Sequence, residues 1–305
     1  MSELGGRAGG VYRPGSDRLN ASSGRAAARR PCPCCGGLEA QTLDRSSRGA
    51  DQERAIVRCS TCSLVFVDPV PRCAVAHSAY GPAYYEPWQE EREERARFDM
   101  WRRRLGLLEA RQGRGALLDV GCGDGLFLNV ARDAGWSVEG IEFSPEGARR
   151  SSQRLGRPVA VGDLAVVSGL RGPFEVVTLW HVLEHLVSPS SLLDAARARL
   201  RPGGLLVAAV PNLDNLPMRA AYRLARGRPL PLYEEGAREP HLSHFCPATF
   251  REILRRRGFE AIEMRADLCA LTPAKRVIDA VAFCLSALCD RLLTDAIVAF
   301  ARRPR

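Results

Sequence analysis

The sequence predicts an α/β fold: a mostly parallel, seven-stranded sheet with helices on both faces, preceded by a small N-terminal module. Apolar strands alternate with helical segments from residue 116 onward, which is the pattern of parallel strands joined by crossover helices. Glycines at alternate positions follow the first of these strands. Two C-x-x-C pairs lie upstream, within residues 32–62, and indicate the separate module.

The first strand of the sheet, residues 116–120, runs into a glycine-rich turn. Its glycines are Gly121, Gly123 and Gly125. Without a Cβ, the backbone can bend sharply and bring its N–H groups against a ligand at the start of the next helix. A dinucleotide turn usually has the spacing G-x-G-x-x-G, and here the third glycine comes one residue earlier. The acids Asp119 and Asp124 also favour a ligand that carries a positive charge over a pyrophosphate.

The next two strands end near acids that suit a nucleoside. The strand at 137–142 ends in Glu142, whose carboxylate can accept hydrogen bonds from both hydroxyls of a ribose. A third strand is expected at 158–164, with Asp163 placed for an adenine amino group. Ligands of parallel sheets bind at the carboxyl ends of the strands. We therefore expect the site at this edge.

The remaining elements complete the sheet. Strands are expected at 174–180 and 205–212, with a helix that closes at residues 200–204 between them. A helix from Pro247 ends at Gly258. Residues 295–302 form a short apolar run with the pattern of a strand, and we expect them to form the seventh strand, antiparallel and at the edge of the sheet.

Five segments in this order resemble the motif ladder of the class I S-adenosylmethionine (SAM) methyltransferases, which have a Rossmann-like fold. They are residues 118–123, 140–142, 162–164, 181–185 and 202–204. The resemblance covers about residues 80–265. It implies that SAM is the methyl donor, with its methionine end at Asp119, its ribose at Glu142 and its adenine at Asp163. The implied cofactor-binding residues are Asp119, Gly121, Gly123, Gly125, Glu142, Phe143, Asp163, Leu164 and Trp180.

Cysteines in the N-terminal part indicate a metal site. Cys32 and Cys35 form one C-x-x-C pair, and Cys59 and Cys62 form the second. Each pair suits a tight turn, and four thiolates suit one tetrahedral structural zinc ion. Two short strands around the second pair predict a zinc ribbon over residues 31–72. A ribbon followed by a charged helix resembles a bacterial subgroup of these methyltransferases that acts on sugars and other small metabolites.

Histidines supply the candidate catalytic groups. Four of the five occur in two pairs, His181 with His185 and His241 with His244. A neutral imidazole suits the removal of a proton from a hydroxyl at cellular pH. We expect His241 or His244 to act as the base, with His181 and His185 as competitors. Alternatively, each of these imidazoles only packs against the lid and caps it.

The segment 181–185 also matches the H-x-x-E-H pattern of a class of zinc proteases, but it begins at the end of a strand and not on a continuous helix. It resembles ubiquinone-pathway O-methyltransferases, in which two acids and a histidine can hold a divalent ion. Here His181 replaces the first acid, which removes one oxygen ligand and weakens the case for magnesium. Glu184 and His185 therefore either hold a metal or orient the loop through hydrogen bonds.

Residues 213–245 follow the fifth strand and are expected to form a lid over the acceptor. An apolar helix is expected over residues 274–293. Two roles are open for it: core packing over the sheet, which we favour, or a contact with a membrane surface. No apolar stretch reaches the roughly 18 residues of a membrane span, and no signal peptide is recognised. We expect a cytoplasmic protein.

The chain has 305 residues and a formal net charge of +9. A nucleic-acid partner is not expected: Lys275 is the single lysine and nearly every cation is arginine, a bias that indicates genome-wide codon composition and not a lysine-rich binding face. The expected organisation is a disordered basic tail at 1–30, the zinc ribbon at 31–72, a helical cover at 73–112 and the methyltransferase domain at 113–305. The expected activity is methyl transfer to a hydroxyl of a sugar, glycolipid or secondary metabolite. The alternatives are an NAD-dependent sugar oxidoreductase and an inactive zinc-ribbon adaptor; the oligomeric state is left open.

Overall fold

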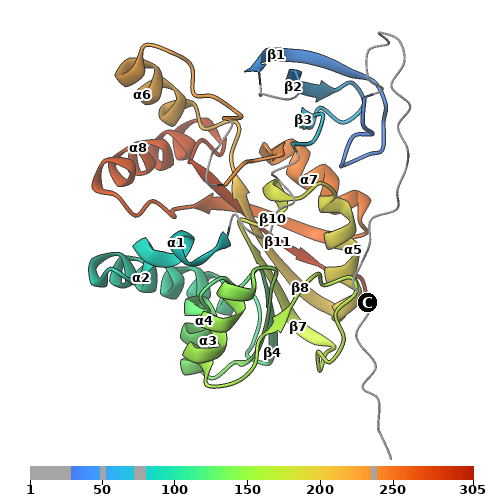
Figure 1. The fold of residues 1–305 in the computed structure, drawn as a ribbon, viewed down its shortest axis with the longest axis vertical. Coiled ribbons are helices and arrows are strands. Elements are labelled where there is room, and N and C mark those ends of the chain that lie inside the picture. The colour runs from blue at the N-terminus through green and yellow to red at the C-terminus, as the bar shows by residue number, and fades with distance from the viewer. Residues whose placement is uncertain (1–28, 49–52, 72–79, 235–238) are drawn as a thin grey trace, which may run out of the picture.

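The computed structural model describes residues 29–48, 53–71, 80–234 and 239–305. Its centre is a seven-stranded sheet with helices on both faces (Figure 1), as the sequence predicts. In spatial order the strands are β10 (Glu260–Asp267), β11 (Ala296–Arg302), β8 (Leu200–Pro211), β7 (Phe174–Trp180), β4 (Ala116–Val120), β5 (Ser137–Glu142) and β6 (Ala160–Val161). The five strands from β8 to β6 run parallel, whereas β11 is antiparallel to both of its neighbours.

Alternate residues of the central strands enter two cores, one on each side of the sheet. On β4, Leu118 packs in one core and Leu117 in the other, because successive side chains of a strand point to opposite faces. The first core contains residues of α5 (Pro189–Arg199) and α7 (Pro247–Arg256). The second contains residues of α2 (Glu91–Glu109), α3 (Leu126–Asp133) and α4 (Pro145–Leu155). This burial on both faces holds the carboxyl ends of the strands in a fixed array.

The N-terminal module has its own antiparallel sheet, formed by β1 (Ala40–Arg48), β2 (Glu53–Cys59) and β3 (Val65–Asp68). The predicted ribbon hairpin is therefore present. A fourth strand, β9 (Ser243–His244), comes from the predicted lid and pairs with β3. Residues 1–28 of the predicted basic tail lie outside the described residues.

The remaining helical elements differ in length. They are α1 (Pro82–Tyr85), η3 (Glu86–Gln89), η4 (Leu183–His185), α6 (Leu216–Arg226) and α8 (Pro273–Cys289). Figure 1 places α1 and α2 together below α8, and α6 above α8. In the described part of the chain, no helix combines the length and apolarity that a bilayer crossing requires.

Four predictions about individual elements are wrong. Strand β11 is not the edge, because β10 pairs with it and forms the edge itself. Strand β8 begins at Leu200, five residues before the predicted start, since Gly203 and Gly204 exchange backbone hydrogen bonds with Arg303. Strand β6 is short because the chain turns away at Gly162, where φ is +126°. The large apolar residues of α8 do not pack over the sheet: most of them are exposed.

Candidate active site

The glycine turn between β4 and α3 requires glycine at all of its predicted positions. Gly121, Gly123 and Gly125 have φ values of +74°, +57° and +78°, in the left-handed region that side chains disfavour. A Cβ on Gly121 would lie 2.7 Å from a methyl carbon of Val182, and one on Gly125 would lie 2.9 Å from the Cα of Ser151. The turn is therefore shaped by close contacts with two other segments.

Asp119 lies in the sheet immediately before this turn. It is 2% exposed, and its Oδ1 accepts a hydrogen bond of 2.6 Å from the hydroxyl of Thr178 on β7. Burial raises the pKa of Asp119 to about 8. The carboxyl group is therefore mostly protonated at pH 7, and a nearby positive charge would favour its ionised form.

Glu142 closes the turn from the end of β5. Its two carboxylate oxygens accept hydrogen bonds of 2.8 Å from the backbone N–H groups of Gly123 and Ser144. Burial raises its pKa, and these hydrogen bonds act in the opposite direction. Each oxygen has a second lone pair, so the predicted contact with a ribose is compatible with this geometry.

The other predicted cofactor residues differ in their surroundings. Phe143 is exposed beside Glu142. Asp163 accepts a hydrogen bond from the N–H of Ala165, whereas Leu164 is buried in the core. Trp180 is buried against the rings of Trp101 and Phe127. Their predicted contacts with SAM stay predictions.

Asp124 does not support a positively charged ligand, contrary to the expectation from the sequence. Its carboxylate forms a buried ion pair with Arg97 of α2, at 3.0 and 2.7 Å. Arg97 also stacks over Trp88, which lies beside the turn: a Cβ on Gly123 would be 3.3 Å from its ring. Trp88 belongs to an aromatic cluster with Tyr80, Tyr84 and Tyr85. Trp88 thus covers the glycine turn from within residues 73–112, the segment that the sequence predicts to be a helical cover.

The histidines gather around one buried carboxylate at the carboxyl end of β7. Glu184 is 1% exposed, and neither of its carboxylate oxygens has a hydrogen-bond partner among the described residues. Nδ1 of His181 lies 3.3 Å from its Oε1, and Nε2 of His185 lies 3.9 Å from the same atom. The ring of His241 lies 5.0 Å from that of His185, measured between centroids. The two pairs of histidines that the sequence shows thus lie together in one cluster around Glu184.

His244 is farther from this centre. Its ring centroid is 6.3 Å from that of His241, and its side chain is buried where β9 joins the ribbon sheet. His181 faces a second buried group, since Arg104 and Asp267 form an ion pair beside its Nε2. His181 also has a φ of +56°, a rare conformation for a residue with a side chain and one that occurs most often at functional sites. No motif in the sequence pointed to Arg104 or Asp267.

The pKa values of these groups are shifted in different directions. Burial lowers the pKa of His241 to about 4 and that of His244 to about 3. Burial also opposes the charged form of His181, but its contacts with Asp267, Cys269 and Glu184 raise its pKa well above the usual value. His185 donates its Nδ1 hydrogen to the carbonyl of Pro240, at 3.1 Å, which leaves Nε2 facing Glu184. His241 is therefore neutral at pH 7 and partly accessible.

The peptide groups of the cluster connect it to the ribbon. The N–H of Leu242 donates to the carbonyl of Glu184 at 2.7 Å, and the carbonyl of Leu242 accepts from Val67 of the ribbon at 3.0 Å. The register of β3 and β9 pairs Val65 with His244. The segment that carries His241 is thus fixed between the loop after β7 and the ribbon.

Three groups of side chains have the donor atoms for a metal. The potential ligand atoms of Cys32, Cys35, Cys59 and Cys62 lie within 4.8 Å of one another, as predicted for a four-thiolate site. Glu184, His185 and His241 form a second group, and His181, Asp267 and Cys269 form a third. The four-cysteine group fits zinc well: the Sγ atoms of Cys32 and Cys62, and those of Cys35 and Cys59, are 3.5 Å apart.

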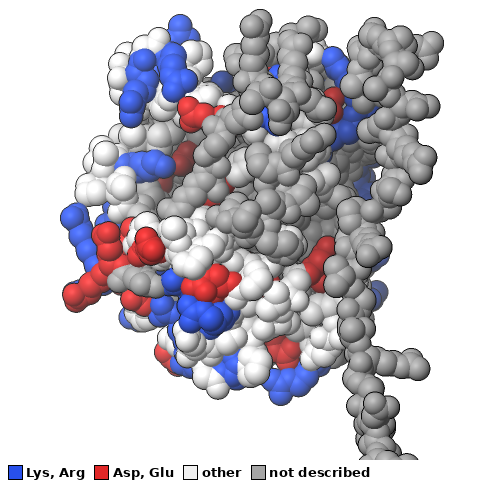
Figure 2. All heavy atoms as spheres, viewed as in Figure 1, with Lys and Arg blue, Asp and Glu red and all other residues white. Residues whose placement is uncertain are grey.

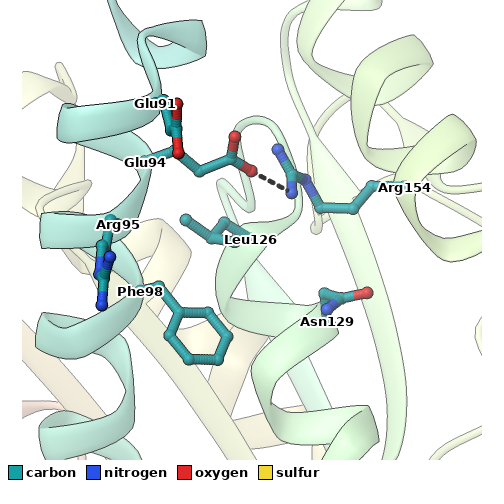
Figure 3. Close-up of a pocket in the computed structure, with 7 residues that line it drawn as sticks. All are labelled: Glu91, Glu94, Arg95, Phe98, Leu126, Asn129 and Arg154. Carbon is teal, nitrogen blue, oxygen red and sulfur yellow. Dashed lines mark hydrogen bonds and ion pairs between the residues drawn. The ribbon is translucent and has the colours of Figure 1, made fainter.

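A shallow hollow of about 380 Å³ lies between α2, α3 and α4 (Figure 3). Glu94 and Arg154 form an ion pair of 2.7 Å at its rim. None of the predicted site residues lines it. The hollow adjoins the back of the glycine turn, where Arg154 donates to the carbonyl of Asp124, and no residue of the histidine cluster lines it.

Comparisons with known proteins agree with this geometry. A family profile described as a methyltransferase domain matches residues 88–264, more than half of the chain. An uncharacterized 37.1 kDa protein in transposon TN4556 of Streptomyces fradiae is 37% identical over 119 residues, which are 37% of this chain and 34% of that protein. A ubiquinone biosynthesis O-methyltransferase of Xanthomonas oryzae pv. oryzae is 35% identical over 137 residues, which are 42% of this chain and 53% of that protein. The chain thus spans about half the length, or less, of these relatives.

Solved structures show the same fold. The 1,6-didemethyltoxoflavin-N1-methyltransferase of Burkholderia thailandensis, solved with 1,6-didemethyltoxoflavin and S-adenosylhomocysteine, matches with a TM-score of 0.51 and 17% identity over 85% of this chain and 99% of that one. A possible histamine N-methyltransferase of Thermotoga maritima matches with a TM-score of 0.52 and 14% identity over 74% of this chain and 98% of that one. The chain therefore belongs to the methyltransferase domain family, with the fold of the class I SAM-dependent methyltransferases.

Proposed function

We propose that this chain transfers the methyl group of SAM to a hydroxyl of a small-molecule acceptor of the sugar, glycolipid or secondary-metabolite class, with His241 as the base. The observation that carries the proposal is the buried carboxylate of Glu184 beside the neutral, partly accessible imidazole of His241. The similar proteins support a small acceptor, since they include an O-methyltransferase of ubiquinone biosynthesis and an N-methyltransferase of a toxoflavin precursor.

The residues of the glycine turn fit SAM. Because its glycines have no Cβ atoms, the N–H groups of the turn are open to a bound ligand. Once ionised, the carboxylate of Asp119 can compensate a positive charge on that ligand. Bound SAM supplies an electrophilic methyl group on a sulfonium. The aromatic cluster of Tyr80, Tyr84, Tyr85 and Trp88 excludes water from this side of the turn.

The histidine cluster supplies the proton acceptor. In the proposed transfer His241 would take the proton of the acceptor hydroxyl, and the new O–CH3 bond would replace the S–CH3 bond of SAM, with S-adenosylhomocysteine as the leaving group. The charge of Glu184 would stabilise the imidazolium that forms. Burial and the charges of His185 and His181 lower the pKa of His241, and the negative carboxylate of Glu184 raises it. His244 is buried in the ribbon sheet and His181 is engaged by Asp267, so His241 is preferred over both.

The test separates cofactor binding from proton transfer. Calorimetric titration with S-adenosylhomocysteine should give binding that is lost in Asp119→Ala and Glu142→Ala and retained in His241→Gln. Turnover with methyl-deuterated SAM and a panel of sugars and phenols should fall at least about 100-fold in His241→Gln, with His244→Gln as the matched control. Binding of NAD without S-adenosylhomocysteine would refute methyl transfer, and binding without turnover on any acceptor would favour the adaptor.

We also propose that the ribbon cysteines hold one structural zinc ion. Cys32 and Cys59 are buried, and the N–H of Gly37 points to the sulfur of Cys35 at 3.4 Å, as in a thiolate site stabilised by peptide groups. Metal analysis of the purified chain should give about one zinc ion per chain. A chain that folds with no bound zinc would refute the assignment.

A further inference from the structure

Helix α8 is attached to the protein by polar groups and not by its large apolar ones. Its buried residues are Asp279, Ala282 and Ser286, which share one face at a spacing of three and four residues. The carboxylate of Asp279 accepts a hydrogen bond from the N–H of Asp295, and the hydroxyl of Ser286 accepts one from the N–H of Leu293. The face that a helix of a globular protein normally uses for apolar packing is therefore mostly polar here.

Another face of α8 is apolar and exposed. Val277, Val281, Leu285 and Leu288 follow one another at spacings of four, four and three residues, so they share a face. Val277 is 65% exposed and Leu288 83% exposed. A contiguous exposed stripe of this kind marks a surface that contacts a partner or a membrane.

Helix α6 packs beside α8 and carries further exposed apolar side chains. It has no buried residue, and Leu216 and Leu224 are both exposed, the latter to 87%. We call the six residues Leu216, Leu224, Val277, Val281, Leu285 and Leu288 the apolar α6–α8 face. Six exposed side chains of this size are more than the scattered apolar residues of an ordinary surface.

The charges around the apolar α6–α8 face are basic. Arg223 and Arg226 are exposed on α6, and Lys275 and Arg276 are exposed in the first turn of α8. Helix α6 has no acidic residue, and the single acid of α8, Asp279, is buried. Figure 2 shows basic side chains among uncharged ones at the corner where Figure 1 places α6. Among the described residues, three acids lie nearby: Asp214 just before α6, Asp290 at the end of α8, and Glu234, which pairs with Arg228.

We propose that the apolar α6–α8 face docks this protein on an anionic membrane surface. Helices that lie in the plane of a membrane bury apolar side chains among the lipid headgroups and place arginine and lysine against anionic lipids. A second copy of the chain fits less well, because a two-fold contact through this face would bring the same arginines together. The proposal does not depend on methyl transfer, since it concerns binding alone.

The experiment uses the full chain with two kinds of vesicle, phosphatidylcholine alone and phosphatidylcholine mixed with phosphatidylglycerol. We expect flotation with the mixed vesicles only, and weaker flotation at higher ionic strength. The double variant Val281→Ser, Leu288→Ser should lower the partition coefficient at least about tenfold, and so should Arg223→Gln, Arg226→Gln. Far-UV circular dichroism and the melting temperature show whether each variant is folded.

Matched control variants lie on other surfaces. Val166→Ser with Val187→Ser removes exposed apolar side chains of the loops, and Arg102→Gln with Arg103→Gln removes two exposed charges of α2. Neither should change flotation by more than about twofold. Absence of flotation, or equal losses in the control variants, would overturn the proposal. A dimer in solution that the Val281→Ser, Leu288→Ser variant abolishes, without any vesicle binding, would assign the face to a second copy instead.

Discussion

Replacing Asp119 by asparagine tests the electrostatics of the cofactor site most directly. The change removes the ionisable group but keeps an oxygen that can accept the hydrogen bond from Thr178. The pKa of Asp119 is raised from 3.8 to about 8: burial and the charge of Glu142 raise it, whereas the hydrogen bond from Thr178 and the charge of Arg104 lower it. The folded state therefore holds a proton that the unfolded state releases between these two pH values.

The change in the free energy of unfolding follows from the raised pKa of Asp119. A carboxylic acid with a raised pKa contributes stability that is fully present below pH 3.8 and is lost as the pH rises toward 8. At pH 7 the loss is about 4 kcal/mol, since each pH unit above the unfolded pKa removes about 1.4 kcal/mol. The asparagine side chain of the Asp119→Asn variant has no such dependence. Denaturant unfolding should show this variant as more stable at pH 7 by up to about 4 kcal/mol, and equal to the original chain below about pH 4.

Ligand affinity gives the second measurement. Only about 1% of Asp119 is ionised at pH 6 and about 9% at pH 7, for a pKa of about 8. If the ionised form binds the ammonium of S-adenosylhomocysteine, affinity rises about ninefold over this interval and about one proton is released per ligand. Calorimetry in buffers of different ionisation enthalpy measures both effects, and Asp119→Asn should show neither. An original chain whose affinity is constant over this interval, with no proton release, would refute the reasoning.

Three further predictions concern the turn, the ribbon and the buried ion pair. Gly125→Ala should destabilise the chain by at least about 2 kcal/mol and abolish ligand binding, because Gly125 has a φ of +78° and an added Cβ would overlap the hydroxyl oxygen of Ser151. Gly106→Ala is the control: Gly106 is exposed in α2, and this variant should raise the melting temperature slightly. Cys59→Ser should lose zinc and increase the hydrogen exchange of residues 241–245. The control Cys289→Ser, at an exposed cysteine, should change neither the zinc content nor the exchange. Unchanged exchange in Cys59→Ser would contradict the link between the ribbon and the site. Arg104→Met should cost about 3–5 kcal/mol in urea unfolding, because it leaves a buried aspartate without its partner; a loss below about 1 kcal/mol would mean that the pair is not buried as described.

Local patterns in the sequence predicted the parts of the fold that depend on neighbouring residues. The end of β5 at Glu142, the end of β7 at Trp180 and the start of α7 at Pro247 lie where predicted. Each depends on short-range signals: an apolar run, an N-cap or a turn glycine. The glycine turn was predictable for the same reason, since a left-handed turn needs residues without Cβ.

Contacts between distant segments could not be predicted in this way. Arg104 and Asp267 are 163 residues apart, and neither is unusual in its local sequence. The pairing of β3 with β9 joins Phe66 to Ser243. The exposed face of α8 was misjudged because an apolar helix has the same composition whether its apolar residues face a core or the surface. In each case the missing information is which surfaces meet in three dimensions.

The pairing of β3 with β9 changes the role that the ribbon can have. A separate ribbon domain would leave the acceptor site unaffected by the loss of its metal. Here the backbone of Leu242 bonds to Val67 on one side and to Glu184 on the other, so one peptide segment connects the ribbon to the buried carboxylate. His241 precedes this segment and His244 pairs with Val65. Because β9 has only two residues, its own hydrogen bonds cannot hold it in place without both neighbours. We therefore infer that the ribbon forms one wall of the proposed acceptor site, and that its four cysteines stabilise the position of the proposed base, His241, from outside the methyltransferase sheet.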